Sequence, residues 1–331
     1  MPSRRRALLV LALLAALAVV SLLAALMAGS LAVAPGDALA ALFGAGSDQG
    51  VGSEVVRELR LPRALGAFAC GGLLALAGAL MQVLLRNPLA DPYVLGISGG
   101  AGVGALLAML FGLPLLLIHG GAFGGALLAM LLVFGLAHGD SSWTQARLLL
   151  TGVIVAAGCG AAVALILTVA PEQKLHGMLF WLMGDAGQIV TPWPALLVLV
   201  AGLALSLPFA REMNLLARGE TLAGALGVAV PRLRRLLYAL ASLLTATAVT
   251  SAGSIGFIGL VVPHLMRLAL GNDQRLLLPA AALAGGTLLT LADTLARTVI
   301  APQQLPVGVL TALIGVPVFL FLLSRQTGGR A

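Results

Sequence analysis

Charged residues, lysines and cysteines are scarce in this chain. Asp, Glu, Lys and Arg together make up 9% of its 331 residues, whereas hydrophobic residues make up 60%. This balance excludes a soluble domain of this length. At about 20 apolar residues per span, there is room for about ten helices, and the short alternating strands of a membrane barrel are absent from the sequence. The composition therefore predicts an all-α polytopic membrane protein with ten transmembrane helices in a single domain, residues 1–331.

Only one of the 19 basic residues is a lysine. A phosphate-binding Gly-rich loop needs a Lys between Gly and Ser or Thr. Lys174 instead lies between Gln173 and Leu175, so the chain lacks such a loop. We therefore expect no cofactor on this chain itself. If ATP drives the protein, a partner ATPase must hold the ATP and Mg²⁺.

The two cysteines, Cys70 and Cys159, lie inside apolar runs. They cannot form a disulfide framework or a metal cluster, and we interpret them as small buried hydrophobes. The sequence shows no paired carboxylates, catalytic triad or His/Cys cluster, which argues against an enzyme and against a metal site. The net charge of +7 does not indicate nucleic-acid binding, because the arginines are scattered at helix ends rather than grouped on one face.

The segment RNPLADPYVLG, residues 86–96, interrupts long uncharged runs at 64–85 and 92–139. A charge at the bilayer centre costs roughly 2.5–3.5 kcal/mol, and proline disfavours helix at its own position and the one before it. We therefore predict a water-side connector between two spanning helices. Its motif residues are Arg86, Asn87, Pro88, Asp91, Pro92 and Gly96.

The same pattern of Gly and Pro returns 175 positions later. Gly78, Pro88, Leu95 and Gly96 match Gly253, Pro263, Leu270 and Gly271. Two equivalent halves are common in transporters, with the substrate path between them. We predict an internal repeat, with halves at about 61–170 and 232–325. The directions expected for the helices that open the halves make it an inverted repeat.

Apolar runs bounded by polar, Gly or Pro residues give the expected elements. Residues 35–63 should form an external loop and 175–185 a short amphipathic segment at the outer interface, near Trp181 and Trp193. Glycines at 96, 100 and 104 share one helix face and favour close packing. A turn is expected at 119–121. The expected helices are 7–27 (uncleaved), 62–85, 94–118, 121–137, 146–169, 193–209, 232–252, 255–270 (short), 276–298 and 307–323.

Residues 211–230 form the most polar break in the second half. An apolar side made by Leu215, Leu216, Leu222, Leu226 and Val228 predicts two short helices on the inner surface. Gly219 and Gly227 can end such helices. A solvated loop would not need this apolar side, so we interpret the segment as a docking surface.

Orientation follows from the tendency of positive charge to stay inside. With both termini cytoplasmic, 14 of the 19 basic residues lie inside, and Arg57, Arg60, Arg63, Lys174 and Arg297 lie outside. If the helix at 255–270 does not span, the C-terminus moves outside and the bias weakens.

Two polar positions within apolar segments are candidate functional residues. Asp293 and Arg297 are four apart on one helix and can pair, or Arg297 can extend to water. His264, after Pro263, is a candidate ligand or proton carrier, or a hydrogen-bonded structural residue. Asp293 is also the one acid available to an ion-gradient-driven secondary transporter, which is the alternative function.

Three stretches resemble the FecCD-type permeases, the membrane subunits of bacterial ATP-driven (ABC) importers for ferric siderophores, haem and cobalamin. They are RNPLADPYVLGISGGAGVGA (86–105), GSIGFIGLVVPHLMRLALGNDQRLLLPAAALAGGTLLTLADTLAR (253–297) and LPVGVLTALIGVPVFLFLL (305–323). The resemblance begins at RLPR (60–63). The matching stretches are long and specific. They imply that Gly100, Pro263, His264 and Asp293 belong to the structural motif together with the motif residues of 86–96.

The resemblance implies a type II importer permease in the bacterial inner membrane. It implies a homodimer with the path along its interface, two ABC ATPase subunits, and a periplasmic or lipid-anchored substrate-binding protein. Arg60, Arg63 and Arg297 would meet acidic residues of that binding protein, and Thr144 and Gln145 would form the cytoplasmic gate. Residues implied for ATPase coupling are Arg211, Asn214, Leu215, Leu216, Arg218, Gly219, Glu220, Ala223, Leu226 and Gly227.

The cargo stays open among these chelates. FWLMGD (180–185) matches the family pattern, but it continues as AGQIV where many iron-type members have a Ser-Leu-Gly-like run.

Overall fold

The structure is a computed structural model that describes residues 4–29, 33–34, 36, 38, 41, 51–137 and 145–327, and the regular elements within these ranges are all helical. Seven helical segments there are long and apolar enough to cross a membrane. Their helices are α1 (Arg4–Met27), α4 (Leu61–Leu84), α6 (Leu115–Ala137), α7 (Gln145–Val169), α9 (Trp193–Ser206), α12 (Val230–Ala252) and α14 (Gln274–Ala296).

Three further apolar helices are shorter, or have a shorter apolar part: α5 (Ile97–Leu110), α13 (Ile258–Leu270) and α15 (Val307–Thr327). The remaining elements are short connectors. They are α3 (Val51–Glu54), the π-helical η1 (Val55–Arg60), η2 (Pro92–Leu95), α8 (Glu172–Met183), η3 (Ala186–Gln188), η4 (Leu207–Phe209), α10 (Ala210–Leu216) and α11 (Glu220–Ala225).

Two expected boundaries are wrong. The external loop does not reach residue 63, because α3, η1 and α4 form one continuous helical segment from Val51. Its residue Val56 is buried, which gives this stretch an apolar contact with the core around α1. The turn expected at 119–121 also lies elsewhere: the chain turns before α6, where Gly112 has a φ of 69° and Pro114 precedes the first helical turn.

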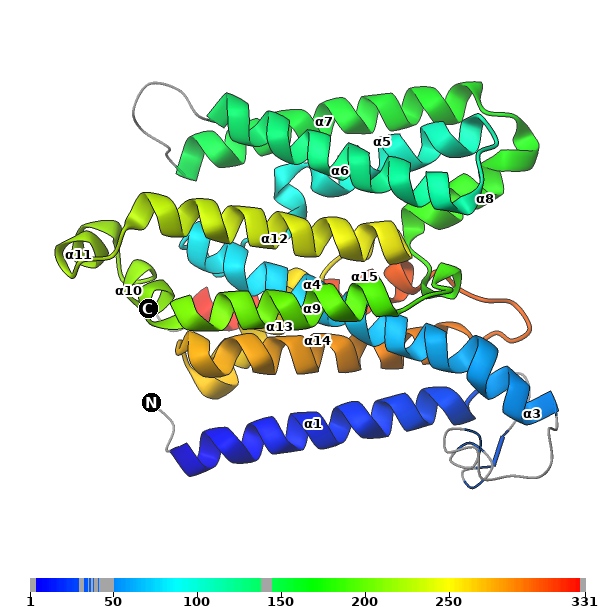
Figure 1. Cartoon of the computed structure of the whole chain (residues 1–331), viewed down its shortest axis with the longest axis horizontal. Helices are drawn as coiled ribbons and strands as arrows, with labels where there is room; N and C mark the ends of the chain where they lie inside the picture. The colour runs from blue at the N-terminus through cyan, green and yellow to red at the C-terminus, as the bar shows by residue number, and fades with distance from the viewer. Residues whose placement is uncertain are drawn as a thin grey trace.

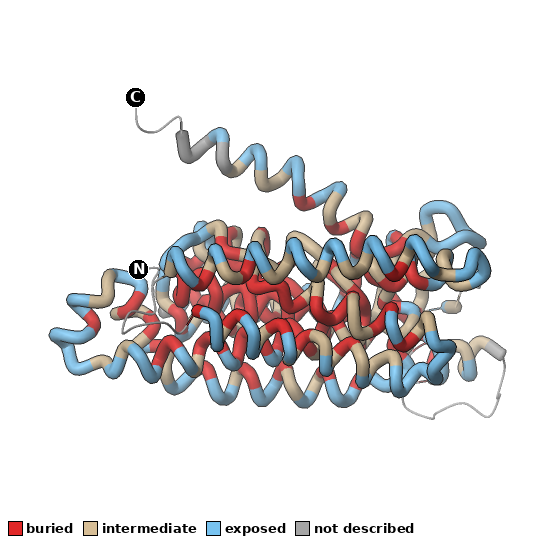
Figure 2. Tube along the Cα trace, turned by 90° about the horizontal axis from the view of Figure 1, so that it is seen from above, coloured by how far each residue is buried: buried red, intermediate tan, exposed pale blue. Residues whose placement is uncertain are grey.

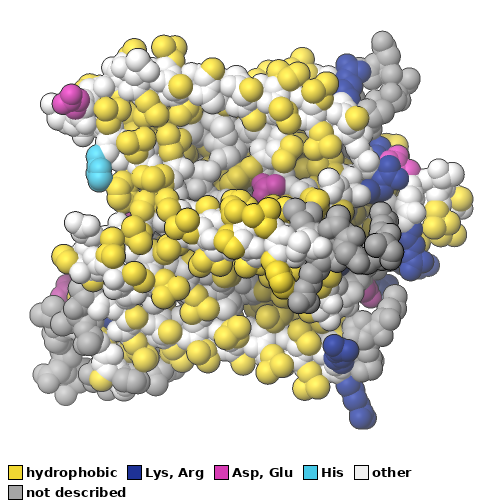
Figure 3. Space-filling model, turned by 180° about the vertical axis from the view of Figure 1, so that it is seen from behind, with side chains coloured by type: hydrophobic (Ala, Val, Ile, Leu, Met, Phe, Trp, Pro, Cys, Tyr) yellow, Lys and Arg dark blue, Asp and Glu magenta, His cyan; other side chains and the backbone are white. Residues whose placement is uncertain are grey.

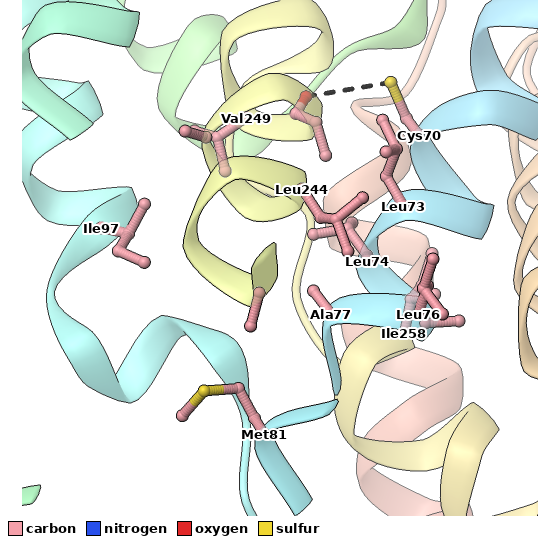
Figure 4. Close-up of a cluster of buried hydrophobic side chains, with 14 of the residues drawn as sticks. Cys70, Leu73, Leu74, Leu76, Ala77, Met81, Ile97, Leu244, Val249 and Ile258 are labelled. Atoms are coloured by element: carbon pink, nitrogen blue, oxygen red, sulfur yellow. Dashed lines mark hydrogen bonds between the residues drawn. The ribbon is translucent and has the colours of Figure 1, made fainter. Parts of the chain in front are cut away.

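Helix α4 is the centre of the bundle and is buried along nearly its whole length. It crosses the molecule between α12, α13 and α14 (Figure 1). Figure 4 shows Cys70, Leu74 and Met81 of this helix among side chains of α5, α12 and α13, with Cys70 Sγ donating to the Ala248 carbonyl at 3.8 Å. Cys70 is the buried small hydrophobe that we expected, whereas Cys159 is only half-buried.

Glycines bring helix backbones into direct contact. A Cβ on Gly78 of α4 would stand 1.8 Å from the Gly259 carbonyl oxygen, and a Cβ on Gly104 of α5 would stand 2.0 Å from that of Gly121. Gly100 meets Gly125 in the same way. The expected glycine stripe therefore serves close helix packing, and Gly96, with φ 73°, allows the chain to turn from η2 into α5.

The order of helix lengths recurs. Helices of 24, 14, 23 and 25 residues (α4 to α7) are followed later by helices of 23, 13, 23 and 21 residues (α12 to α15). Helices α4 and α12 run in opposite directions in Figure 1. The first residues of the matched helices are 159 to 169 positions apart. The offset of 175 positions predicted from the sequence therefore does not align the helices of the two halves. At that offset Pro88 lies in a loop while Pro263 lies inside α13.

Segments 86–96 and 253–257 meet in the interior. Tyr93 Oη accepts a hydrogen bond from Ile255 N and donates one to Ile255 O, each at 3.0 Å, and the hydroxyls of Ser98 and Ser254 lie 2.8 Å apart. Both short helices, α5 and α13, begin from this junction. The segment 86–96 is therefore not simply a water-side connector, because its second half returns into the bundle.

The ends of the bundle differ. The start of α1 and the end of α15 lie at the same end as α10 and α11 (Figure 1). Helix α15 contacts the bundle through its first turns and then inclines away from it (Figure 2), leaving Leu313, Leu320 and Phe321 exposed. At the opposite end, α8 carries Trp181, which is buried and not at the surface as expected, and Lys174, whose Nζ donates to the Leu110 carbonyl at the end of α5, 2.8 Å away.

Candidate functional site

Helices α10 and α11 project from one end of the bundle (Figure 1). They are the two short helices that the sequence predicts within 211–230. Ala217 ends the first, and Gly219, with φ 129°, begins the second. Gly227, with φ 84°, turns the chain toward α12. Because a Cβ at either glycine would meet open space, each glycine serves the backbone conformation and not packing.

The apolar residues of this projection divide into two groups. Leu216 and Ala223 are fully buried inside the chain, where they hold the projection on the bundle. Their role in ATPase coupling stays a prediction. Leu222 and Leu226, 45% and 58% exposed, face outward. Arg211 and Arg218 are exposed and Leu215 is half-buried. The projection therefore has an apolar outer tip flanked by arginines, a surface suited to another protein.

Glu220 ties the projection to the bundle. Its Oε1 lies 3.1 Å from Arg86 Nη2 and also pairs with Arg234 of α12. Arg86 Nη2 donates to Gln145 Oε1 at 3.3 Å, and Gln145 Nε2 donates to the Leu84 carbonyl at 3.3 Å. One ionic network thus joins α11, the end of α4, α12 and the first residue of α7.

Arg86 itself has a φ of 45°, a conformation that L-residues adopt rarely. Holding this side chain between Glu220 and Gln145 fixes the break after α4. Sequence reasoning placed Arg86 in the structural motif and Gln145 in the gate but did not join them, and it missed Arg234. Thr144, the other expected gate residue, lies outside the described residues.

Asn214 attaches α10 to the start of α14. Its Nδ2 donates to Asp273 Oδ1 at 2.9 Å, and its Oδ1 accepts from Gln274 N at 2.9 Å. Asp273 also caps α14 by accepting from Arg275 N. A displacement of the projection would therefore act on α14 as well as on α4 and α12.

At the opposite end, Arg63 and Asp293 form a largely buried, bidentate ion pair. Arg63 Nη2 lies 2.8 Å and Nε 2.9 Å from the carboxylate oxygens, and the Asp293 side chain is 3% exposed. Arg63 also donates to Gln304 Oε1 at 2.9 Å and lies 3.7 Å from Asp185. The expected partner of Asp293, Arg297, is farther away at 3.8 Å. Sequence reasoning missed Asp185 and Gln304, which come from connecting segments.

Arg60 and Arg297 bind the end of α1. Arg60 Nη1 donates to the Leu26 and Met27 carbonyls at 2.8 and 3.1 Å, and Arg297 Nη2 donates to the Ala25 carbonyl. These carbonyls lie in the last turn of α1, where helix carbonyls have no hydrogen-bond donor within the helix. The two arginines, expected to face outward, are thus largely committed inside the chain. Docking by Arg60, Arg63 and Arg297 stays a prediction.

The other motif residues have local roles. Asn87 Oδ1 and Asp91 Oδ1 accept from the backbone two residues later, at 2.9 and 2.7 Å, and so shape the turns around Pro88. Pro92 begins η2 and packs against Gly259. Pro263 lies inside α13, where His264 is buried. The described residues contain no group of three or more His, Cys, Asp or Glu placed to hold a metal.

Basic side chains gather at one end of the molecule. On the face shown in Figure 3, Lys and Arg lie at the end that carries α10 and α11, and the band beside them is mostly hydrophobic. That this end faces the cytoplasm stays a prediction.

Comparisons with known proteins agree with this architecture. The model of the FecCD transport family matches residues 16–325. The hemin transport system permease protein HmuU of Yersinia pestis is 44% identical over 83% of this chain and 84% of its own length. The vitamin B12 import system permease protein BtuC of Citrobacter koseri is 39% identical over 90% and 89%. A solved structure titled as an inward-facing conformation of a metal-chelate type ABC transporter has a TM-score of 0.82 at 31% identity, covering 96% of this chain and 99% of that one.

Proposed function

The chain belongs to the FecCD transport family and is the permease of an ABC importer, and we propose that its cargo is a metal tetrapyrrole, haem or cobalamin. The observation that carries this proposal is the high identity, over most of the chain, to permeases named for hemin and for vitamin B12. Both cargos hold a metal ion in a tetrapyrrole-type ring. A ferric siderophore is the remaining cargo class of the metal-chelate type.

We infer that all ten apolar helices cross the inner membrane of a bacterium, with both termini in the cytoplasm. Support comes from the shared end of α1, α15 and the projection (Figure 1), and from the arginines at that end (Figure 3). The recurring order of helix lengths and the opposed directions of α4 and α12 support an inverted repeat. Its halves, about 61–170 and 232–325, meet at Tyr93 and Ile255.

We propose that two ATPase subunits, which bind ATP and Mg²⁺, act on two copies of this permease through the projections. The outer tip, Leu222 and Leu226, would be the contact, and the Glu220 network would carry its displacement to Arg86 and Gln145. A second copy of the permease would pack along α7 and α15. Helix α7 exposes Gly158 and Gly160, which have open space beside them and would allow a helix of the second copy to approach closely, and α15 inclines away from its own bundle. The path would run between the two copies.

A binding protein would deliver the cargo at the opposite end. Arg60, Arg63 and Arg297 lie together there, and a guanidinium can donate two parallel hydrogen bonds to one carboxylate. To bind these arginines, the binding protein has to replace the hydrogen bonds that they make within the permease. Acidic residues of the binding protein would compete with Asp293 and with the α1 carbonyls.

Reconstitution tests the proposal. The permease is placed in proteoliposomes with its ATPase, with ATP inside and the loaded binding protein outside, and uptake of haem, cobalamin and a ferric siderophore is compared. Uptake of haem or cobalamin that requires ATP supports the assignment. Uptake of the siderophore alone refutes the tetrapyrrole cargo. Uptake by this chain without the ATPase, under an ion gradient, contradicts the ATP-driven mechanism.

A further inference from the structure

We propose that a cavity at the inner end of the permease binds the phosphate headgroup of an anionic phospholipid. The cavity measures about 970 Å³ and lies between the start of α1, the end of α4, α10 and the connection from α13 to α14. We call it the arginine cavity, because five arginines line it. Its charged lining residues are Arg86, Arg211, Arg218, Arg267, Arg275 and Asp273.

Most of this positive charge has no ionic partner in the described part of the chain. Arg86 is paired with Glu220, but Arg211, Arg218 and Arg275 take part in no ion pair among the described residues, and neither does Arg267, which donates to Gln82 Oε1 at 2.9 Å. The one lining acid, Asp273, is occupied by Asn214 and the backbone of Arg275. Several guanidinium groups around one cavity suit a phosphate, which they bind bidentately.

The position of the cavity favours a lipid over a soluble anion. Its lining is also apolar, with Ala7 and Leu8 of α1 and Leu270 and Leu276 beside the arginines. Leu8, Leu9 and Leu13 of α1 are exposed along a membrane-spanning helix. A lipid headgroup meets its acyl chains at a boundary between polar and apolar surroundings, and this cavity has both arginines and apolar side chains. Basic pockets between transmembrane helices on the cytoplasmic side bind such headgroups.

The experiment measures lipid retention by the full-length permease. Purified protein in detergent is titrated with dioleoylphosphatidylglycerol, with dioleoylphosphatidylcholine and with inorganic phosphate, and binding is followed by native mass spectrometry and thermal unfolding. We expect phosphatidylglycerol to bind and to raise the unfolding temperature, and the other two to have little effect. The double variant Arg267→Gln/Arg275→Gln should weaken phosphatidylglycerol binding about tenfold or more, as the loss of two charged contacts implies.

The matched control is Arg232→Gln/Arg235→Gln, which removes two exposed arginines from the same end that do not line the cavity. It should bind phosphatidylglycerol like the parent protein. If the double variant at 267 and 275 does not fold, the single variant Arg275→Gln, at an exposed position, should still weaken binding severalfold while the protein keeps its unfolding temperature without lipid.

Three results would overturn the proposal: equal retention by the parent and the Arg275→Gln variant, equal loss in the control, or a stabilisation by inorganic phosphate equal to that by the lipid, which would make the cavity a soluble-anion site. Lipid retention is measured without ATP or cargo, so this proposal and the cargo assignment can fail separately.

Discussion

The two ends of the bundle use arginine in opposite ways. At the end near α8, Arg60, Arg63 and Arg297 are bound to a buried carboxylate and to the last carbonyls of α1. At the end near α10, Arg211, Arg218 and Arg275 are exposed, whereas Arg86, Glu220 and Arg234 form an ion-paired network. The first arrangement fixes helices to one another, while the second leaves charge available to partners and lipid. Four experiments break or sharpen this comparison.

The largest effect is expected at the fixed end. Asp293→Asn leaves the Arg63 guanidinium without its carboxylate in a buried site, and we expect a loss of about 3–5 kcal/mol in the free energy of unfolding. Thermal unfolding of the purified permease in detergent measures it. Asp185→Asn is the control, because Asp185 lies 3.7 Å from Arg63 and its side chain is 21% exposed. This substitution should lower the free energy of unfolding by less than about 1 kcal/mol. Equal costs would show that the bidentate pair is not the anchor.

The second comparison is within the projection. Leu216→Ala empties a fully buried site and should cost about 2–5 kcal/mol of stability. Leu226→Ala, at the exposed tip, should change stability by less than about 0.5 kcal/mol yet weaken association with the ATPase about tenfold. Unfolding curves and pull-down titrations separate the two. Normal association of the Leu226 variant would remove the tip from the proposed contact.

The third substitution addresses transmission. Glu220→Gln removes the charge shared by Arg86 and Arg234, a loss of about 1.5–3 kcal/mol in charged hydrogen bonds. We expect uptake per ATP hydrolysed to fall about tenfold while the complex still assembles. Glu212→Gln, in α10 and outside every ion pair of the described residues, should leave this ratio unchanged. An unaltered ratio in the Glu220 variant would show that the network is structural only.

The smallest effect is expected for Arg60→Gln. The carbonyls of Leu26 and Met27 lose a charged donor. We therefore expect the free energy of local opening of the last turn of α1 to fall by about 1–2 kcal/mol. Hydrogen exchange of α1 amides measures this opening. If exchange is unchanged but affinity for the binding protein falls, Arg60 acts in docking rather than in holding α1.

Much of the architecture could be predicted because apolar length and helix breakers are local properties. Within the described part of the chain, the apolar runs located the seven long helices and the three shorter ones. The apolar side of 211–230 predicted α10 and α11. The glycine spacing at 100 and 104 predicted a packing face that α6 occupies. The boundaries failed in two places. Helix α3 and the π-helical η1 replaced the part of the expected loop that follows residue 50, and the turn expected at 119–121 lies near Gly112, which has a positive φ.

The sequence by itself determined the lipid-embedded helical class, the absence of a nucleotide-binding lysine loop and the family motifs, because composition and spacing suffice for each. Only the tertiary structure decided which charges are partners. Arg63 pairs with Asp293, 230 positions away, and Glu220 joins Arg86, and through it Gln145. A side chain's partner is set by which helices cross and by what they bury, and neither the spacing between Asp293 and Arg297 nor the 175-residue echo contains that information.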